Sequence, residues 1–163
     1  MDSELIALSE RLGAACRQRR LLLATAESCT GGWAAQVITH TAGSSGWFER
    51  GFVTYANEAK VGMLGVRPET LQEFGAVSPE TAAEMAVGAL TNSNAMISMA
   101  ITGIAGPTGG SPGKPVGTVC FAWCRTGASP ETETRIFAGD REGVRRQAVI
   151  HALRGFLLRF DTA

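Results

Sequence analysis

Leu21-Leu-Leu-Ala-Thr-Ala-Glu-Ser-Cys-Thr-Gly-Gly-Trp33 is the stretch that decides the fold of this chain. Its first six residues form a mostly apolar run, which predicts a short buried strand. The next residues, Ser28 to Gly32, are small and polar, and a helical pattern then runs from Trp33 to Thr41. A buried strand that turns directly into a helix is typical of α/β proteins.

The elements on either side of this junction extend the α/β pattern without an internal repeat or a linker. Apolar residues at helical spacing predict a helix over residues 4–19. Ser78, followed by Pro79, and Asp140 are natural N-caps of two later helices. The other predicted strands span residues 51–55, 96–101, 118–124 and 132–137, and the last two of them form a hairpin. The other predicted helices span residues 58–64 and 81–90, and a glycine-rich loop covers 103–117. We predict one domain over residues 1–163, an α/β fold in the form of a three-layer α/β/α sandwich on a mixed β-sheet.

Composition and charge limit the class of protein. Apolar residues make up 45% and charged residues 18% of the chain, as in ordinary soluble globular proteins. Acidic and basic residues number 15 each, so we expect no nucleic-acid partner. The acidic N-terminus does not resemble a signal peptide, and no apolar run reaches the roughly 18 residues of a membrane span. We therefore expect a cytoplasmic protein without a membrane partner, in which the strand cysteines Cys120 and Cys124 are buried thiols.

Several familiar catalytic patterns are missing from the sequence. The two histidines, His40 and His151, both fall in helical patterns, which argues against a metal site and a Ser-His-Asp triad. Gly113-Lys114 is followed by proline, so the glycine-rich loop does not fit a phosphate-binding P-loop. Tyr55 and Lys60 are five residues apart rather than the four of short-chain dehydrogenases, and no G-x-G-x-x-G follows a strand. We expect neither a metal nor an organic cofactor.

The junction after the first strand is the best candidate for chemistry. Open α/β sheets bind ligands at the carboxyl ends of their strands, and a helix N-terminus offers N–H groups to an anion or an oxyanion. Gly31 and Gly32 would let the backbone approach a ligand closely. These features make Ser28 a candidate nucleophile. The alternative is that Ser28 or Thr30 only caps the helix.

A serine nucleophile needs a base, and Lys60 is the candidate. Thirteen of the fifteen basic residues are arginines, which cannot act as bases at neutral pH, whereas a desolvated lysine can. Lys60 follows the second predicted strand, where its amine would reach the sheet edge that carries Ser28. Its pKa would have to fall from about 10.4 toward neutrality. The alternative is a solvated surface lysine.

Five motifs, taken together, resemble those of the CinA C-terminal domain family. They are Thr25–Gly32, Gly43–Lys60, Gly75–Ser78, Thr102–Pro107 and Lys114–Thr118. The likeness extends over essentially the whole chain, and the first, second and fourth motifs are the most specific. Many members carry a second, N-terminal domain. This chain lacks one and begins with its own Met, so we expect the stand-alone form.

The resemblance implies an amidase that converts nicotinamide mononucleotide to nicotinic acid mononucleotide and ammonia without a metal. It assigns Ser28 as the nucleophile and Lys60 as the general base. It further implies that Tyr55 helps to order this pair and that Thr102 is a catalytic-site threonine.

This hypothesis requires donors for the oxyanion and for the substrate phosphate. The candidates for the oxyanion are backbone N–H groups of Cys29, Thr30 and Gly31, or of Thr102 and Gly103. The candidates for the phosphate are the loop from Gly106 to Gly113 and Arg145, with Arg141 on the same helical face; a solvated helix face is the alternative for both arginines.

Three alternatives stay open at the level of sequence. Cys29 is a rival nucleophile within the same motif. The chain could instead be a non-catalytic nucleotide-binding or partner-binding module linked to competence or the response to DNA damage, as the family's name suggests. A third possibility is an amidase for another small amide. We expect a homodimer or a higher homo-oligomer.

Overall fold

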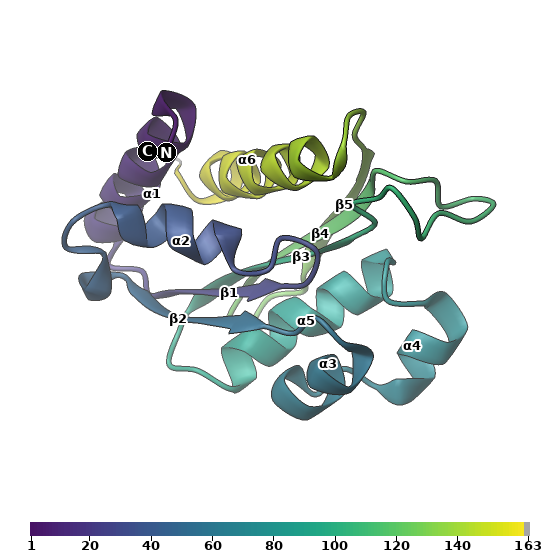
Figure 1. Cartoon of the computed structure of the whole chain (residues 1–163). Helices are drawn as coiled ribbons and strands as arrows, with labels where there is room; N and C mark the ends of the chain where they lie inside the picture. The colour runs from purple at the N-terminus through teal and green to yellow at the C-terminus, as the bar shows by residue number, and fades with distance from the viewer. Residues whose placement is uncertain (162–163) are drawn as a thin grey trace.

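Strand β1 (Leu23–Glu27) is an inner strand of the sheet, and it positions the junction at residues 28–32 that follows it. The computed structural model describes residues 1–161. Its sheet has the order β2-β1-β3-β4-β5 (Figure 1). The other strands are β2 (Phe48–Val53), β3 (Ile97–Gly103), β4 (Thr118–Arg125) and β5 (Glu131–Ile136). β1 is parallel to β2 and β3, whereas β4 is antiparallel to β3 and β5, which confirms the predicted mixed sheet and the hairpin.

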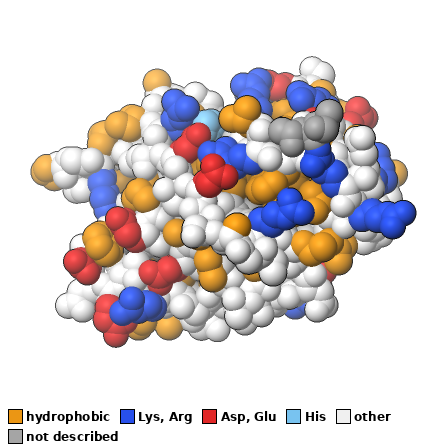
Figure 2. Space-filling view, turned by 180° about the vertical axis from the view of Figure 1, so that it is seen from behind, with side chains coloured by type: hydrophobic (Ala, Val, Ile, Leu, Met, Phe, Trp, Pro, Cys, Tyr) orange, Lys and Arg blue, Asp and Glu red, His pale blue; other side chains and the backbone are white. Residues whose placement is uncertain are grey.

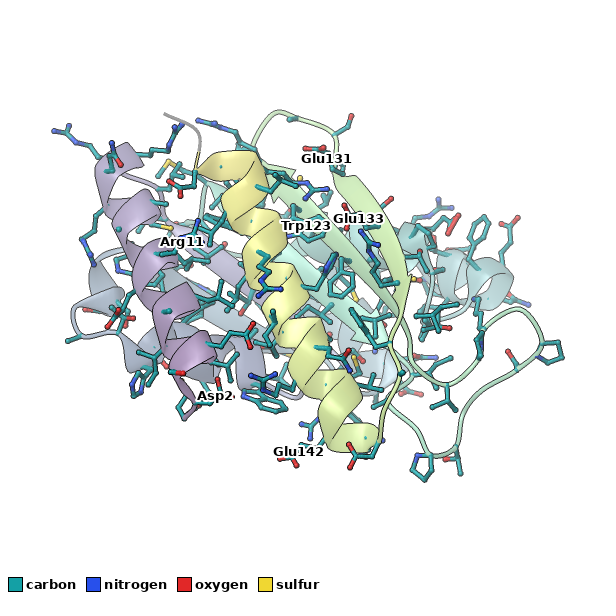
Figure 3. The ribbon with its side chains drawn as sticks, turned by 90° about the horizontal axis from the view of Figure 1, so that it is seen from above. Asp2, Arg11, Trp123, Glu131, Glu133 and Glu142 are labelled. Atoms are coloured by element: carbon teal, nitrogen blue, oxygen red, sulfur yellow. The ribbon has the colours of Figure 1, made fainter. Side chains whose placement is uncertain are left out.

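Helices cover both faces of this sheet, as the three-layer prediction requires (Figure 1). One face carries α1 (Ser3–Arg19), α2 (Trp33–His40) and α6 (Arg141–Phe160), and the other carries α3 (Asn57–Leu64), α4 (Pro68–Phe74) and α5 (Pro79–Thr91). Each face has its own buried apolar cluster. Trp123 of β4 lies beneath α6, where its indole donates to the carbonyl of Ala152 at 3.0 Å (Figure 3). A side chain at Gly155 would overlap this ring, so glycine allows α6 to pack closely on the sheet.

The predicted caps are present, while some element boundaries differ. Ser78 accepts a hydrogen bond from Thr81 N at 3.1 Å, and Asp140 accepts one from Gly143 N at 2.8 Å. β2 spans Phe48–Val53 rather than residues 51–55, because an edge strand can include charged residues such as Glu49 and Arg50. Helix α4 and a short 3₁₀ turn at Ser44–Gly46 were not predicted. The buried residue of α4 is the polar Thr70, so this helix shows little apolar periodicity.

The surface carries charges of both signs, in keeping with the equal numbers of acidic and basic residues. Basic and acidic side chains share the face opposite to that of Figure 1 (Figure 2). Among residues 1–161, no helix combines the length and the apolar character needed to cross a bilayer. Cys120 and Cys124 are buried and free, as predicted.

Candidate active site

The carboxyl ends of three parallel strands bring the sequence motifs together. The register pairs Glu27 at the end of β1 with Val53 of β2 and with Ile101 of β3. The next residues continue this alignment: Ser28 N donates to the carbonyl of Ile101 at 2.9 Å, and Thr54 N donates to the carbonyl of Glu27 at 2.9 Å. From β1 the chain goes to β2 on one side of it and to β3 on the other, so the junction lies at a topological switch point, where such sheets bind ligands.

A cavity of about 250 Å³ opens at this edge of the sheet. Its walls come from the β1–α2 junction, the β2–α3 connection, the α4–α5 connection, the end of β3 with the loop after it, and the start of α6. The lining residues are Ser28, Cys29, Tyr55, Asn57, Lys60, Ala76, Val77, Thr102, Gly103, Ile104, Ala105, Gly106, Thr108, Gly109 and Arg141. A larger hollow of about 690 Å³ lies between α3 and α5, and none of these residues lines it.

Ser28 and Lys60 are in direct contact at the base of the cavity. Lys60 Nζ lies 2.9 Å from Ser28 Oγ. Ser28 directly follows β1, and Lys60 lies in α3, the helix after β2, 32 positions further along the chain. Lys60 is 1% exposed and Ser28 is 8% exposed. The amine also donates to the carbonyls of Thr54 at 2.8 Å and Tyr55 at 3.1 Å. The alternative of a solvated surface lysine is therefore wrong.

Burial shifts the protonation equilibrium of Lys60 toward its neutral form. Burial lowers the pKa of its amine, and the nearby thiol of Cys29 opposes this effect only in part. A neutral amine has two N–H groups and one lone pair. As an ammonium, Lys60 donates its three N–H groups to the two carbonyls and to Ser28 Oγ. Once it loses a proton, the two carbonyls can keep the two remaining N–H groups, and the lone pair then faces Ser28 Oγ. In that state Lys60 can accept the hydroxyl proton of Ser28.

Cys29, the rival nucleophile, lies in a different environment. Its side chain is 5% exposed, and burial together with the carboxylate of Glu27 raises the pKa of the thiol to about 12. The thiolate is the reactive form of cysteine, so a thiol with such a pKa is a poor nucleophile near neutral pH.

Glu27 occupies the N-terminus of α2, which corrects the expectation of free N–H groups there. Its buried carboxylate accepts hydrogen bonds from Ala34 N at 2.9 Å, Ala35 N at 3.0 Å and Thr30 Oγ1 at 2.6 Å. The N–H of Gly31 donates to the carbonyl of Ser28. Gly31 is thus engaged and is not an oxyanion donor. Neither Ser28 nor Thr30 caps α2, since the carboxylate of Glu27 does so.

We expect replacement of Glu27 by glutamine to lower the free energy of unfolding by about 1–3 kcal/mol. The glutamine NH₂ would face backbone N–H groups of α2, and a buried donor would lose its acceptor. Urea denaturation followed by tryptophan fluorescence measures the effect. Thr30→Val removes only one of the three bonds and serves as the matched control, with a cost of about 1 kcal/mol. Equal stabilities of the wild type and Glu27→Gln would contradict this role.

Tyr55 and Thr102 contact the site in ways that the sequence did not specify. The backbone carbonyl of Tyr55 accepts a hydrogen bond from Lys60. The residue as a whole is 61% exposed, and its phenol oxygen accepts a hydrogen bond from Arg141 at 2.9 Å. Thr102 is buried and donates to the carbonyl of Ala76 at 2.8 Å. Thr102 therefore ties the α4–α5 connection to the end of β3 and fixes one wall of the cavity.

The two arginines at the start of α6 have different positions. Arg145 does not line the cavity: its guanidinium donates to the carbonyls of Cys29 at 2.9 Å and Thr30 at 3.3 Å and lies over the ring of Trp33. Arg141 does line it. Gly103 and Gly106 also lie on the cavity wall, whereas Thr30 and Gly31 are not among its lining residues.

Sequence reasoning missed Glu27, Asn57 and the wall formed by Ala76 and Val77. No local spacing rule predicts that a strand-end carboxylate caps a helix seven residues later. The wall residues follow α4, a helix that was itself not predicted, although Pro68 at its first turn and Gly75 after it were available signals.

The histidines and possible metal ligands lie outside this arrangement. His40 ends α2, and His151 of α6 contacts Glu133 at 2.7 Å; neither lines the cavity. Within residues 1–161 no group of three or more His, Cys, Asp or Glu side chains is placed to hold a metal ion.

Comparison with known proteins identifies the family to which this fold belongs. Residues 5–159 match the family model of the CinA C-terminal domain. The nicotinamide-nucleotide amidohydrolase PncC of Escherichia coli K12 is 55% identical over 159 residues, covering 98% of this chain and 96% of that protein. A putative competence-damage inducible protein of Symbiobacterium thermophilum is 51% identical over 94% of this chain but only 38% of its own length. The crystal structure of the competence/damage inducible protein CihA from Agrobacterium tumefaciens superposes with a TM-score of 0.94 at 43% identity, covering 99% of this chain and 98% of that one.

Proposed function

The chain belongs to the CinA C-terminal domain family, and from this premise we propose that it hydrolyses the carboxamide of nicotinamide mononucleotide to release ammonia and nicotinic acid mononucleotide. The observation that carries this proposal is the buried contact of 2.9 Å between Lys60 Nζ and Ser28 Oγ at the base of a cavity. The name of the Escherichia coli relative supplies the substrate.

The proposed reaction is acyl transfer through a serine ester. Neutral Lys60 accepts the proton of Ser28 Oγ as this oxygen attacks the carboxamide carbon. Backbone N–H groups on the cavity wall, from Cys29 or from Thr102 and Gly103, stabilise the oxyanion; one such donor contributes about 3–4 kcal/mol. The C–N bond then breaks, and Lys60 gives the proton to the leaving nitrogen, which departs as ammonia.

Water then hydrolyses the serine ester, and Lys60 again acts first as a base and then as an acid. Lys60 takes a proton from water, and the resulting hydroxide attacks the ester carbon. The bond to Ser28 breaks as its oxygen regains a proton from Lys60. The sum is one amide and one water consumed, and one carboxylic acid and one ammonia formed. The enzyme returns to its starting state.

Product analysis tests the proposed function directly. The protein is incubated with nicotinamide mononucleotide, and ammonia and nicotinic acid mononucleotide are both quantified. We expect the two products in equal amounts. Tight binding of the mononucleotide without release of ammonia would contradict the proposal and would favour a non-catalytic nucleotide-binding module.

A further inference from the structure

Arg141 gives the cavity a side chain that stays cationic at neutral pH, whereas Lys60 acts as a neutral amine in the proposed mechanism. It is the first residue of α6, and its guanidinium donates to the carbonyl of Gly106 at 2.8 Å and to the phenol oxygen of Tyr55 at 2.9 Å. Both acceptors are uncharged. Arg146 of the same helix, in contrast, pairs with Asp2. The described part of the chain offers Arg141 no carboxylate at ion-pair distance.

An uncompensated guanidinium on a cavity wall favours an anionic ligand. No acidic side chain is among the cavity's lining residues within positions 1–161. A guanidinium has five N–H donors in a planar fork that matches phosphate oxygens. The two bonds of Arg141 to neutral acceptors leave donors free for a phosphate.

The position of Arg141 separates it from the reacting groups. Ser28 and Lys60 are buried at the base of the cavity, whereas Arg141 contacts the largely exposed phenol of Tyr55. A mononucleotide matches this arrangement, because its reacting carboxamide and its 5′-phosphate are at opposite ends of the molecule. We propose that Arg141, rather than Arg145, binds the 5′-phosphate of the substrate. This inference rests on the proposed function, because it takes the mononucleotide as the ligand.

Calorimetric binding measurements test the role of Arg141 without turnover. In a Ser28→Ala background, the Kd values of nicotinamide mononucleotide and nicotinamide riboside are measured with and without Arg141→Met. We expect Kd for the mononucleotide to rise about 10–100-fold and Kd for the riboside to change less than about threefold, because only the former carries the phosphate. Arg141→Lys should recover part of the loss.

Arg11→Met is the matched control. Arg11 lies on α1 and approaches Asp161 beyond the end of α6, away from the first turn of α6 that Glu142 marks in Figure 3. This variant should leave both Kd values unchanged. The inference is overturned if Arg141→Met leaves Kd for the mononucleotide unchanged, or if it weakens both ligands equally. A wild-type protein that binds the mononucleotide but releases no ammonia would instead refute the proposed function, so the two failures are distinguishable.

Discussion

Replacing Ser28 by alanine should lower kcat for the release of ammonia from nicotinamide mononucleotide by about 10⁴–10⁶-fold. The variant lacks the hydroxyl that lies beside Lys60 Nζ, and the two carbonyls near this amine cannot replace it. No serine ester can therefore form. The fold should be retained, because Ser28 interacts with β3 through its backbone N–H. The measurement is a single-turnover assay of ammonia with enzyme in excess.

Cys29→Ala is the control for this prediction. Its thiol is buried and has a pKa raised to about 12, so its removal should change kcat less than about tenfold, through packing alone. If Cys29→Ala were inactive and Ser28→Ala active, Cys29 would be the nucleophile and the assignment of Ser28 would be wrong.

Replacement of Lys60 should lower kcat by about 10⁴-fold, at the upper end of general acid–base effects, because this group both removes and returns protons. Lys60→Arg and Lys60→Met should be similarly inactive, since arginine keeps the charge but cannot give up its proton at neutral pH. Parallel denaturation curves separate lost chemistry from lost stability. Substantial activity in Lys60→Arg would contradict a role for the neutral amine.

The pH dependence of the wild type follows from the same chemistry. Lys60 is active as a base only after it loses its proton, so kcat/KM should rise with pH through the pKa of Lys60 in the folded protein. Burial places that pKa below the ordinary lysine value of about 10.4, so the rise occurs at a lower pH than for a solvated lysine.

The parts of the fold that follow local rules could be predicted from sequence. Ser78 and Asp140 act as caps because their side chains bond N–H groups three residues away. The meeting of Ser28 and Lys60 was also within reach, because the carboxyl ends of parallel strands share one edge of the sheet.

The rest of the site depends on tertiary packing. Arg141 and Arg145 are four residues apart on one helical face, and only the way in which α6 crosses the sheet decides which of them lines the cavity. Similarly, the occupation of the N-terminus of α2 by Glu27 requires the strand end and the helix to be placed in space.

The titration of Lys60 tests the central claim most directly. The chain contains two lysines, Lys60 and Lys114, so protein labelled with ¹³C at lysine Cε gives two lysine signals, and Lys60→Arg identifies the one of interest. The account predicts a titration midpoint for Lys60 below the ordinary lysine value. A midpoint at or above that value would mean that the amine stays charged beside Ser28 and cannot take its proton.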